Sequence, residues 1–157
     1  MMDEKLCSLE PVPGQRNSPR RAVLFLIYKK VQFANAKDKF LALTGDEERT
    51  LLSRIDYWID GKIAKRYFHG WDSSQYRGKY TECFVFKLQD RRFYGFLAHP
   101  KSADRRFEVC VLVLHEEKNQ WETEESDLRR SKEVSENADV KKALTEYYDP
   151  RSGSKRR

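Results

Sequence analysis

A run of ionisable side chains directly follows the most apolar stretch of this sequence. Residues 109–114 (VCVLVL) are apolar throughout, and residues 115–119 (HEEKN) are polar throughout. A rigid strand fixes the backbone of the groups at its end, so His115 and Lys118 are well placed for chemistry. An imidazole can serve as a base or an acid near neutral pH, and an ammonium group supplies a point charge. The same pattern is found wherever a strand leaves a core for solvent, so both interpretations stay open.

Two further charged residues lie within predicted strands. Arg92 begins an aromatic-rich run and shares one strand face with Tyr94 by the two-residue period. A guanidinium binds two phosphate oxygens at once, which makes Arg92 the first candidate for a phosphate contact. The alternative interpretation is that Arg92 is an ordinary solvent-exposed arginine at the start of a strand. Glu82 lies among apolar residues, so it is either an edge residue or a base with a shifted pKa.

Cations alternate with aromatic residues between positions 62 and 79. Such a mixture can follow a phosphate backbone and stack on bases. The predicted nucleic-acid contacts are the cations of this stretch and two tyrosines near it: Lys65, Arg66, Arg77, Lys79, Tyr80 and Tyr94. The alternative is a loop whose aromatic side chains pin it to the domain, and core packing is expected for at least one of the two tyrosines.

Composition limits the class of protein. The 157 residues suit one domain with tails, and the formal net charge of +6 favours nucleic acid, an anionic membrane or an acidic protein as partner. Three cysteines without a CxxC pair indicate a reducing compartment and argue against a zinc site. We expect no metal and no cofactor. No secretory signal and no membrane-length apolar run is apparent, so a cytoplasmic location is expected.

The apolar periodicity predicts an α+β domain with a small, mainly antiparallel sheet of about four strands. A helical hairpin on one face is predicted from a cap at Asn35, a capping box of Thr44 and Glu47, and a stop at Gly61. A charged C-terminal helix with a break near Asn137 completes the order β-α-α-β-β-β-α. Residues 1–21 are predicted to be a flexible leader, residues 22–148 the domain, and residues 149–157 a basic disordered tail.

With this order of elements, the chain resembles the RelE/ParE superfamily of bacterial toxin–antitoxin toxins, including its RelE-like, HigB-like and phage-derived members. The resemblance covers roughly residues 22–144. The short stretches that carry it are Gly78-Lys79-Tyr80-Thr81-Glu82, Arg92-Phe93-Tyr94, the strand from Val111 to His115, and the turn from Lys118 through Thr123 to Leu128 and Ser131. Two positions depart from the family pattern. Phe84 occupies the position of the family's first-strand arginine. The family's double lysine is reduced to Lys118 followed by Asn119.

The resemblance implies a ribosome-dependent mRNA endoribonuclease in which the 2′-hydroxyl group of the RNA attacks the phosphate without a metal. Such chemistry requires a base for that hydroxyl, cations for the charge on the phosphate and a donor for the leaving oxygen. Arg92 and Lys118 would contact the phosphate, and His115 or Glu82 would be the base. The implied partners are a cognate antitoxin, the ribosome and mRNA.

Two other functions stay open. The departures at Phe84 and Asn119 favour a non-catalytic protein of the same fold that binds a protein target such as DNA gyrase. The basic stretch at residues 62–79 fits a general nucleic-acid-binding module.

Overall fold

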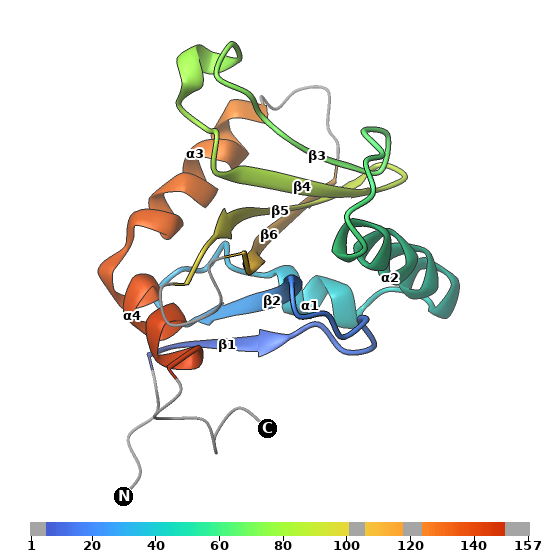
Figure 1. Cartoon of the computed structure of the whole chain (residues 1–157), viewed down its shortest axis with the longest axis horizontal. Coiled ribbons are helices and arrows are strands. Elements are labelled where there is room, and N and C mark those ends of the chain that lie inside the picture. Colours follow the sequence, from blue (N-terminus) through green and yellow to red (C-terminus); the bar gives the residue numbers. More distant parts are fainter. Residues whose placement is uncertain (1–5, 101–105, 118–123, 150–157) are drawn as a thin grey trace, which may run out of the picture.

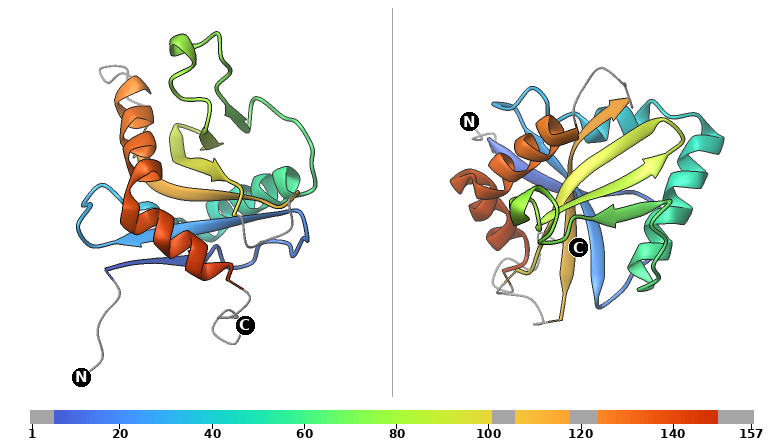
Figure 2. Two further views of the ribbon diagram at one scale, coloured as in Figure 1. Left: turned by 60° about the vertical axis from the view of Figure 1, so that its left-hand side comes forward. Right: turned by 90° about the horizontal axis from the view of Figure 1, so that it is seen from above.

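The computed structural model describes residues 6–100, 106–117 and 124–149 of the chain. One six-stranded sheet is covered by helices on both faces, with α1 and α2 on one side and α3 and α4 on the other (Figures 1 and 2). The predicted α+β class is confirmed. Among the described helices, none combines the length and the apolar character needed to cross a membrane.

The sheet is mixed, with the strand order β1-β2-β6-β5-β4-β3. Its strands are β1 (Cys7–Pro11), β2 (Arg21–Tyr28), β3 (Phe68–Gly70), β4 (Cys83–Leu88), β5 (Arg91–Ala98) and β6 (Glu108–Glu117). β2 and β6 pair in parallel, and every other neighbouring pair is antiparallel. The four predicted strands form the centre, and β1 and β3 add an unpredicted strand at each edge.

The first of these edge strands lies in the segment that the sequence predicts to be a flexible leader. β1 pairs antiparallel with β2, from Cys7 opposite Tyr28 to Pro11 opposite Leu24. Cys7, Leu9 and Val12 are buried. The leader prediction is therefore wrong for this segment, because alternate apolar residues gain burial when they extend the sheet. Residues 1–5 and 150–157, to which the predictions of a mobile leader and tail also apply, lie outside the described residues.

The helices α1 (Ala36–Leu41) and α2 (Gly45–Ile59) pack on one face of the sheet. The predicted capping box of α2 is confirmed, since Glu47 N donates to Thr44 Oγ1 at 3.2 Å and Thr44 N donates to Glu47 Oε1 at 2.9 Å. Asn35 precedes α1 as predicted, but its side chain makes no cap bond. Its Oδ1 instead accepts a hydrogen bond from the backbone N–H of His115 at 2.8 Å, which ties α1 to the end of β6.

The helices α3 (Glu124–Glu136) and α4 (Ala138–Tyr147) cover the opposite face through buried Leu128, Val134 and Val140. The predicted break between them is confirmed. Asn137 caps α4, with its Oδ1 accepting from the N–H groups of Asp139 at 2.8 Å and Val140 at 3.3 Å.

A β-bulge interrupts the pairing of β5 with β6. Tyr94 lies opposite Leu114 and Gly95 lies opposite Leu112, so Val113 is an extra residue in β6. The two backbones approach so closely here that a Cβ atom on Gly95 would lie 2.0 Å from the carbonyl oxygen of Val111. A glycine is therefore required at the centre of the sheet.

Candidate functional site

Three ionisable side chains lie on adjacent strands, on the face of the sheet that α3 covers. Lys87 on β4 pairs with Arg92 on β5, and His69 on β3 pairs with Val85 on β4. Val85 belongs to the core beneath α3, and strand residues two apart share a face. His69, Lys87 and Arg92 therefore form one group, here called the cationic row.

The imidazole of His69 is arranged to accept a proton. Its Nδ1 lies 2.9 Å from the carbonyl oxygen of Gly70, which can only accept, so Nδ1 carries the proton and Nε2 keeps its lone pair. Nε2 has no hydrogen-bond partner within the described part of the chain. Burial lowers the pKa of His69 below its usual 6.5, and the positive charges of Lys87 and Arg92 lower it further. The imidazole is consequently neutral at pH 7.

Backbone carbonyl groups hold the two cations of the row. Lys87 Nζ donates to Lys65 O at 3.2 Å. Arg92 Nη1 donates to Gln89 O at 2.7 Å and to its neighbour's carbonyl, Arg91 O, at 2.9 Å. These contacts fix the two cations on either side of the turn between β4 and β5.

A pocket of about 760 Å³ opens beside β3, at the edge of the sheet. This β3-edge pocket is lined by His69 and Lys87, by three more cations and by four aromatic side chains: Arg21, Lys62, Lys65, Trp58, Phe68, Trp71 and Phe84. Asp72 is the one acidic residue in its lining. Arg21 forms an ion pair with Glu108 at 3.3 Å, which leaves three lysines against one carboxylate in the lining. This excess of positive charge favours an anionic ligand, and the aromatic walls suit a flat one.

The loop between β3 and β4 is attached to the N-terminal end of α3, which it approaches in Figure 1. Trp71 Nε1 donates to Glu124 Oε2 at 3.0 Å, and the hydroxyl group of Tyr76 donates to the same oxygen at 3.2 Å. The hydroxyl group of Tyr80 donates to Glu125 Oε2 at 2.9 Å. These bonds hold one wall of the β3-edge pocket, because Trp71 lines it.

Both tyrosines predicted to stack on bases are packed inside the protein instead. Tyr80 is buried and bonded to Glu125, and Tyr94 is buried and stacks on Trp71 with ring centroids 6.3 Å apart. Burial raises the pKa of Tyr94 far above its usual value. The prediction that they stack on RNA bases is therefore wrong for this conformation, and the expected core packing applies to both.

The side chain of His115 lies on the opposite face of the sheet from that of Arg92. It is buried on the α1/α2 face, against the ring of Phe93 and with Nε2 3.2 Å from Arg91 Nη1. The bulge causes this, because the extra residue Val113 shifts the in-and-out alternation of β6 by one position. Burial first, and then the charge of Arg91, lowers the pKa of His115. The prediction of His115 as the base beside Arg92 is wrong.

The two remaining catalytic predictions also fall outside the cationic row. Glu82 precedes β4, and its carbonyl oxygen accepts from Leu97 N at 2.7 Å, at the opposite end of the β4–β5 hairpin from Arg92. At roughly 3.3 Å per strand residue this separates the two side chains by about 16 Å. Glu82 Oε1 is buried and makes no hydrogen bond. Lys118 lies outside the described residues.

The four predicted cations of the 62–79 stretch are exposed. Lys65 lines the β3-edge pocket, whereas Arg66, Arg77 and Lys79 do not. Arg77 has a positive φ of 56°, a left-handed backbone that a side-chain-bearing residue adopts at some energetic cost.

Sequence reasoning missed Lys87 and placed His69 only among the loop aromatics. A signal for Lys87 exists, because it interrupts the apolar run of β4 (CFVFKL) at the level of Arg92. No comparable signal marks His69, since β3 has three residues and its pairing with β4 is a long-range contact.

Among the described residues, no group of three or more His, Cys, Asp or Glu side chains gathers that could hold a metal ion. Comparison with protein-family models gives no match to this chain, and comparisons with curated proteins and with solved structures give none either.

Proposed function

We propose that this protein is a toxin-like endoribonuclease that cleaves mRNA on the ribosome, with the cationic row as its active site. The observation that carries the proposal is His69. A neutral imidazole, whose Nε2 has no hydrogen-bond partner among the described residues, lies in one row with Lys87 and Arg92, beside a pocket of about 760 Å³ rich in cations. This row contains a base, a proton donor and a charge-stabilising group, which are the three parts that cleavage through a 2′-hydroxyl group requires.

Each residue of the row has one role in the reaction. His69 Nε2 accepts the proton of the 2′-hydroxyl group, and the resulting oxygen attacks the neighbouring phosphorus. The guanidinium of Arg92 stabilises the non-bridging oxygens as charge develops on them. The bond from phosphorus to the 5′ oxygen then breaks, and the ammonium group of Lys87 donates a proton to that oxygen. The products are a 2′,3′-cyclic phosphate and a 5′-hydroxyl end, and the proton on His69 returns to Lys87 through solvent.

The order of elements supports a toxin of the RelE type. From β2 to α3 the chain runs β-α-α, then the small edge strand β3, then β-β-β-α. Apart from β3, this is the order that the resemblance implies, and β6 lies between β2 and β5 at the centre of the sheet. Growth arrest on expression and neutralisation by a cognate antitoxin are parts of the same proposal.

The test is cleavage of mRNA on translating ribosomes by the purified protein, with the ends of the products identified chemically. His69→Gln should slow cleavage by about 10²- to 10⁴-fold, as loss of a general base does. Arg92→Ala should slow it by about 10²-fold or more. The control is His99→Gln, since His99 is exposed and directly follows the end of β5 that is far from Arg92. Circular dichroism checks the folding of each variant. Undiminished cleavage by folded His69→Gln would remove the row from the reaction.

Phe84, which stands where the RelE/ParE family has an arginine in its first strand, favours a second function. Phe84 is buried, with its ring 5.6 Å from that of Trp58 and 6.0 Å from that of Phe68. This position supplies no cation, which favours a toxin-fold protein that binds a protein target such as DNA gyrase. Growth arrest that persists in His69→Gln while mRNA stays intact would select this second function.

A further inference from the structure

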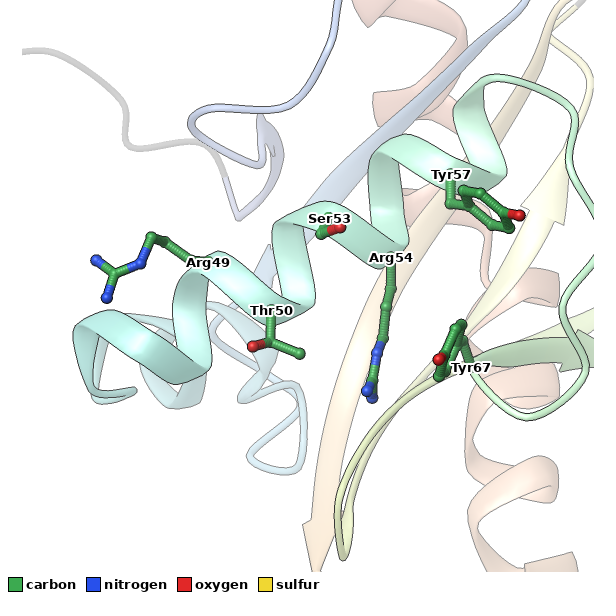
Figure 3. A pocket seen from close by; sticks show the side chains of 6 residues that line it. All are labelled: Arg49, Thr50, Ser53, Arg54, Tyr57 and Tyr67. Carbon is green, nitrogen blue, oxygen red and sulfur yellow. The ribbon is translucent and has the colours of Figure 1, made fainter.

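A second polar groove lies on the outer side of α2. It has a volume of about 520 Å³ and is lined by Arg49, Thr50, Ser53, Arg54, Tyr57 and Tyr67 (Figure 3). We call it the α2 groove. Its size falls within the range of about 300 to 1,000 Å³ that is typical of ligand sites. Its lining has two guanidinium groups and four hydroxyl groups, which are donors that suit an anion. The guanidinium of Arg49 pairs with the carboxylate of Asp46, so Arg54 is the cation that we consider for an anion here.

The spacing of these residues along α2 produces the groove. Arg49, Ser53 and Tyr57 follow one another at intervals of four, and Thr50 and Arg54 form a neighbouring pair at the same interval. Residues four apart lie on one side of a helix. The buried stripe of α2, from Leu51 to Ile59, faces the sheet, so the groove residues are directed away from the core.

Arg54 is fixed in position before any ligand binds. Its Nη1 donates to the carbonyl oxygen of Lys87 at 2.7 Å, and its guanidinium carbon lies 4.3 Å from the centre of the Tyr67 ring. Figure 3 shows the side chain directed from α2 toward Tyr67, while Arg49 projects from the N-terminal half of the helix. A guanidinium held in this way loses little conformational entropy when it binds a phosphate.

Two parts of the chain contribute both to the α2 groove and to the β3-edge pocket. Lys87 holds Arg54 with its carbonyl oxygen, and its side chain lines the β3-edge pocket. The segment between α2 and β3 contributes Lys65 to the β3-edge pocket and Tyr67 to the α2 groove. An extended anionic chain that crosses this segment would contact both sites.

We propose that the α2 groove binds a phosphodiester group of single-stranded RNA, one or more nucleotides away from the bond at the cationic row. This inference rests on the proposed function for its substrate. Arg54 contacts the phosphate, and Tyr57, a residue that is 43% exposed, offers its ring to the adjoining base. A free mononucleotide carries the same phosphate chemistry, so the test includes both ligands.

The test is the binding of fluorescent 2′-O-methyl RNA, which lacks the attacking hydroxyl group and therefore reports binding whether or not the protein is a nuclease. An octanucleotide, a dinucleotide and adenosine monophosphate are compared by fluorescence anisotropy or competition. Arg54→Gln should weaken octanucleotide binding about tenfold, the loss of one charge-assisted contact, and leave dinucleotide binding unchanged. Tyr57→Ala should weaken octanucleotide binding by a similar factor. Lys141→Gln, which removes an exposed charge on α4, is the control.

Each outcome decides a different question. Octanucleotide binding by folded Arg54→Gln and Tyr57→Ala at the wild-type level would overturn the inference. Equal weakening for adenosine monophosphate and the octanucleotide would make the groove a free-nucleotide site and would also overturn it. Length-dependent weakening in a protein that cleaves no RNA would uphold the groove and reject the proposed nuclease. Because Arg54 also packs on Tyr67, thermal unfolding of each variant is measured in parallel, and Tyr57→Ala tests the groove without disturbing that contact.

Discussion

Replacing Gly95 by alanine should severely destabilise the protein. A Cβ atom at this position would lie 2.0 Å from Val111 O, 2.8 Å from Val111 C and 3.0 Å from Leu112 Cα. All three atoms belong to the backbone of β6, which is paired with β2 on one side and β5 on the other. Since no flexible side-chain end is available to move, the clash can be relieved only by separating β5 from β6 by roughly 1 Å.

That separation has two energetic costs. Overpacking in a core typically costs about 1–3 kcal/mol, and each weakened ladder hydrogen bond costs about 0.5–1.5 kcal/mol. We therefore expect Gly95→Ala to lower the free energy of unfolding by about 3–5 kcal/mol, a large share of the roughly 5–15 kcal/mol that stabilises a typical domain. At an m-value of about 2 kcal/mol per molar urea, the midpoint should fall by about 2 M.

The assay is urea unfolding followed by circular dichroism, with Gly45→Ala as the matched control. Gly45 is the first residue of α2, and its added Cβ would meet only the flexible end of Arg49 at 3.4 Å. Alanine there should be neutral or stabilising by up to about 1 kcal/mol. A Gly95→Ala variant that unfolds within about 1 kcal/mol of the wild type would refute the argument from backbone contact.

Three further predictions follow from single contacts. Thr44→Ala should lower the free energy of urea unfolding by about 1 kcal/mol through loss of the bond to Glu47 N, and an unchanged midpoint would contradict that. Because burial lowers the pKa of His115 in the folded state, the unfolded chain binds its proton more readily. Stability should therefore fall as the pH drops below 6.5, less steeply in His115→Gln, and urea midpoints measured across this range test this. Burial, followed by the charge of Lys87, lowers the pKa of His69, so the acidic limb of the cleavage rate should lie below pH 6.5 and move upward in Lys87→Gln. An unmoved limb would argue against His69 as the base.

Local features of this protein were determined by the sequence itself. Thr44 and Glu47 form their capping box, and Asn137 caps α4 where the break was expected. The amphipathic stripe of α2 is buried as its period predicts. These features involve residues within a few positions of one another, so the chain contains all the information they require.

The composition of the site was decided by the tertiary structure. His69 and Arg92 share a row only through the pairing of β3 with β4 and of β4 with β5, which no local pattern encodes. The extra residue Val113 turns His115 to the other face, although strict alternation would place it with Val109 and Val111. Strand register and a single bulge are properties of the assembled sheet. The sequence therefore indicated Arg92 as a candidate, and the pairing of the strands gave it His69 and Lys87 as neighbours in place of His115 and Glu82.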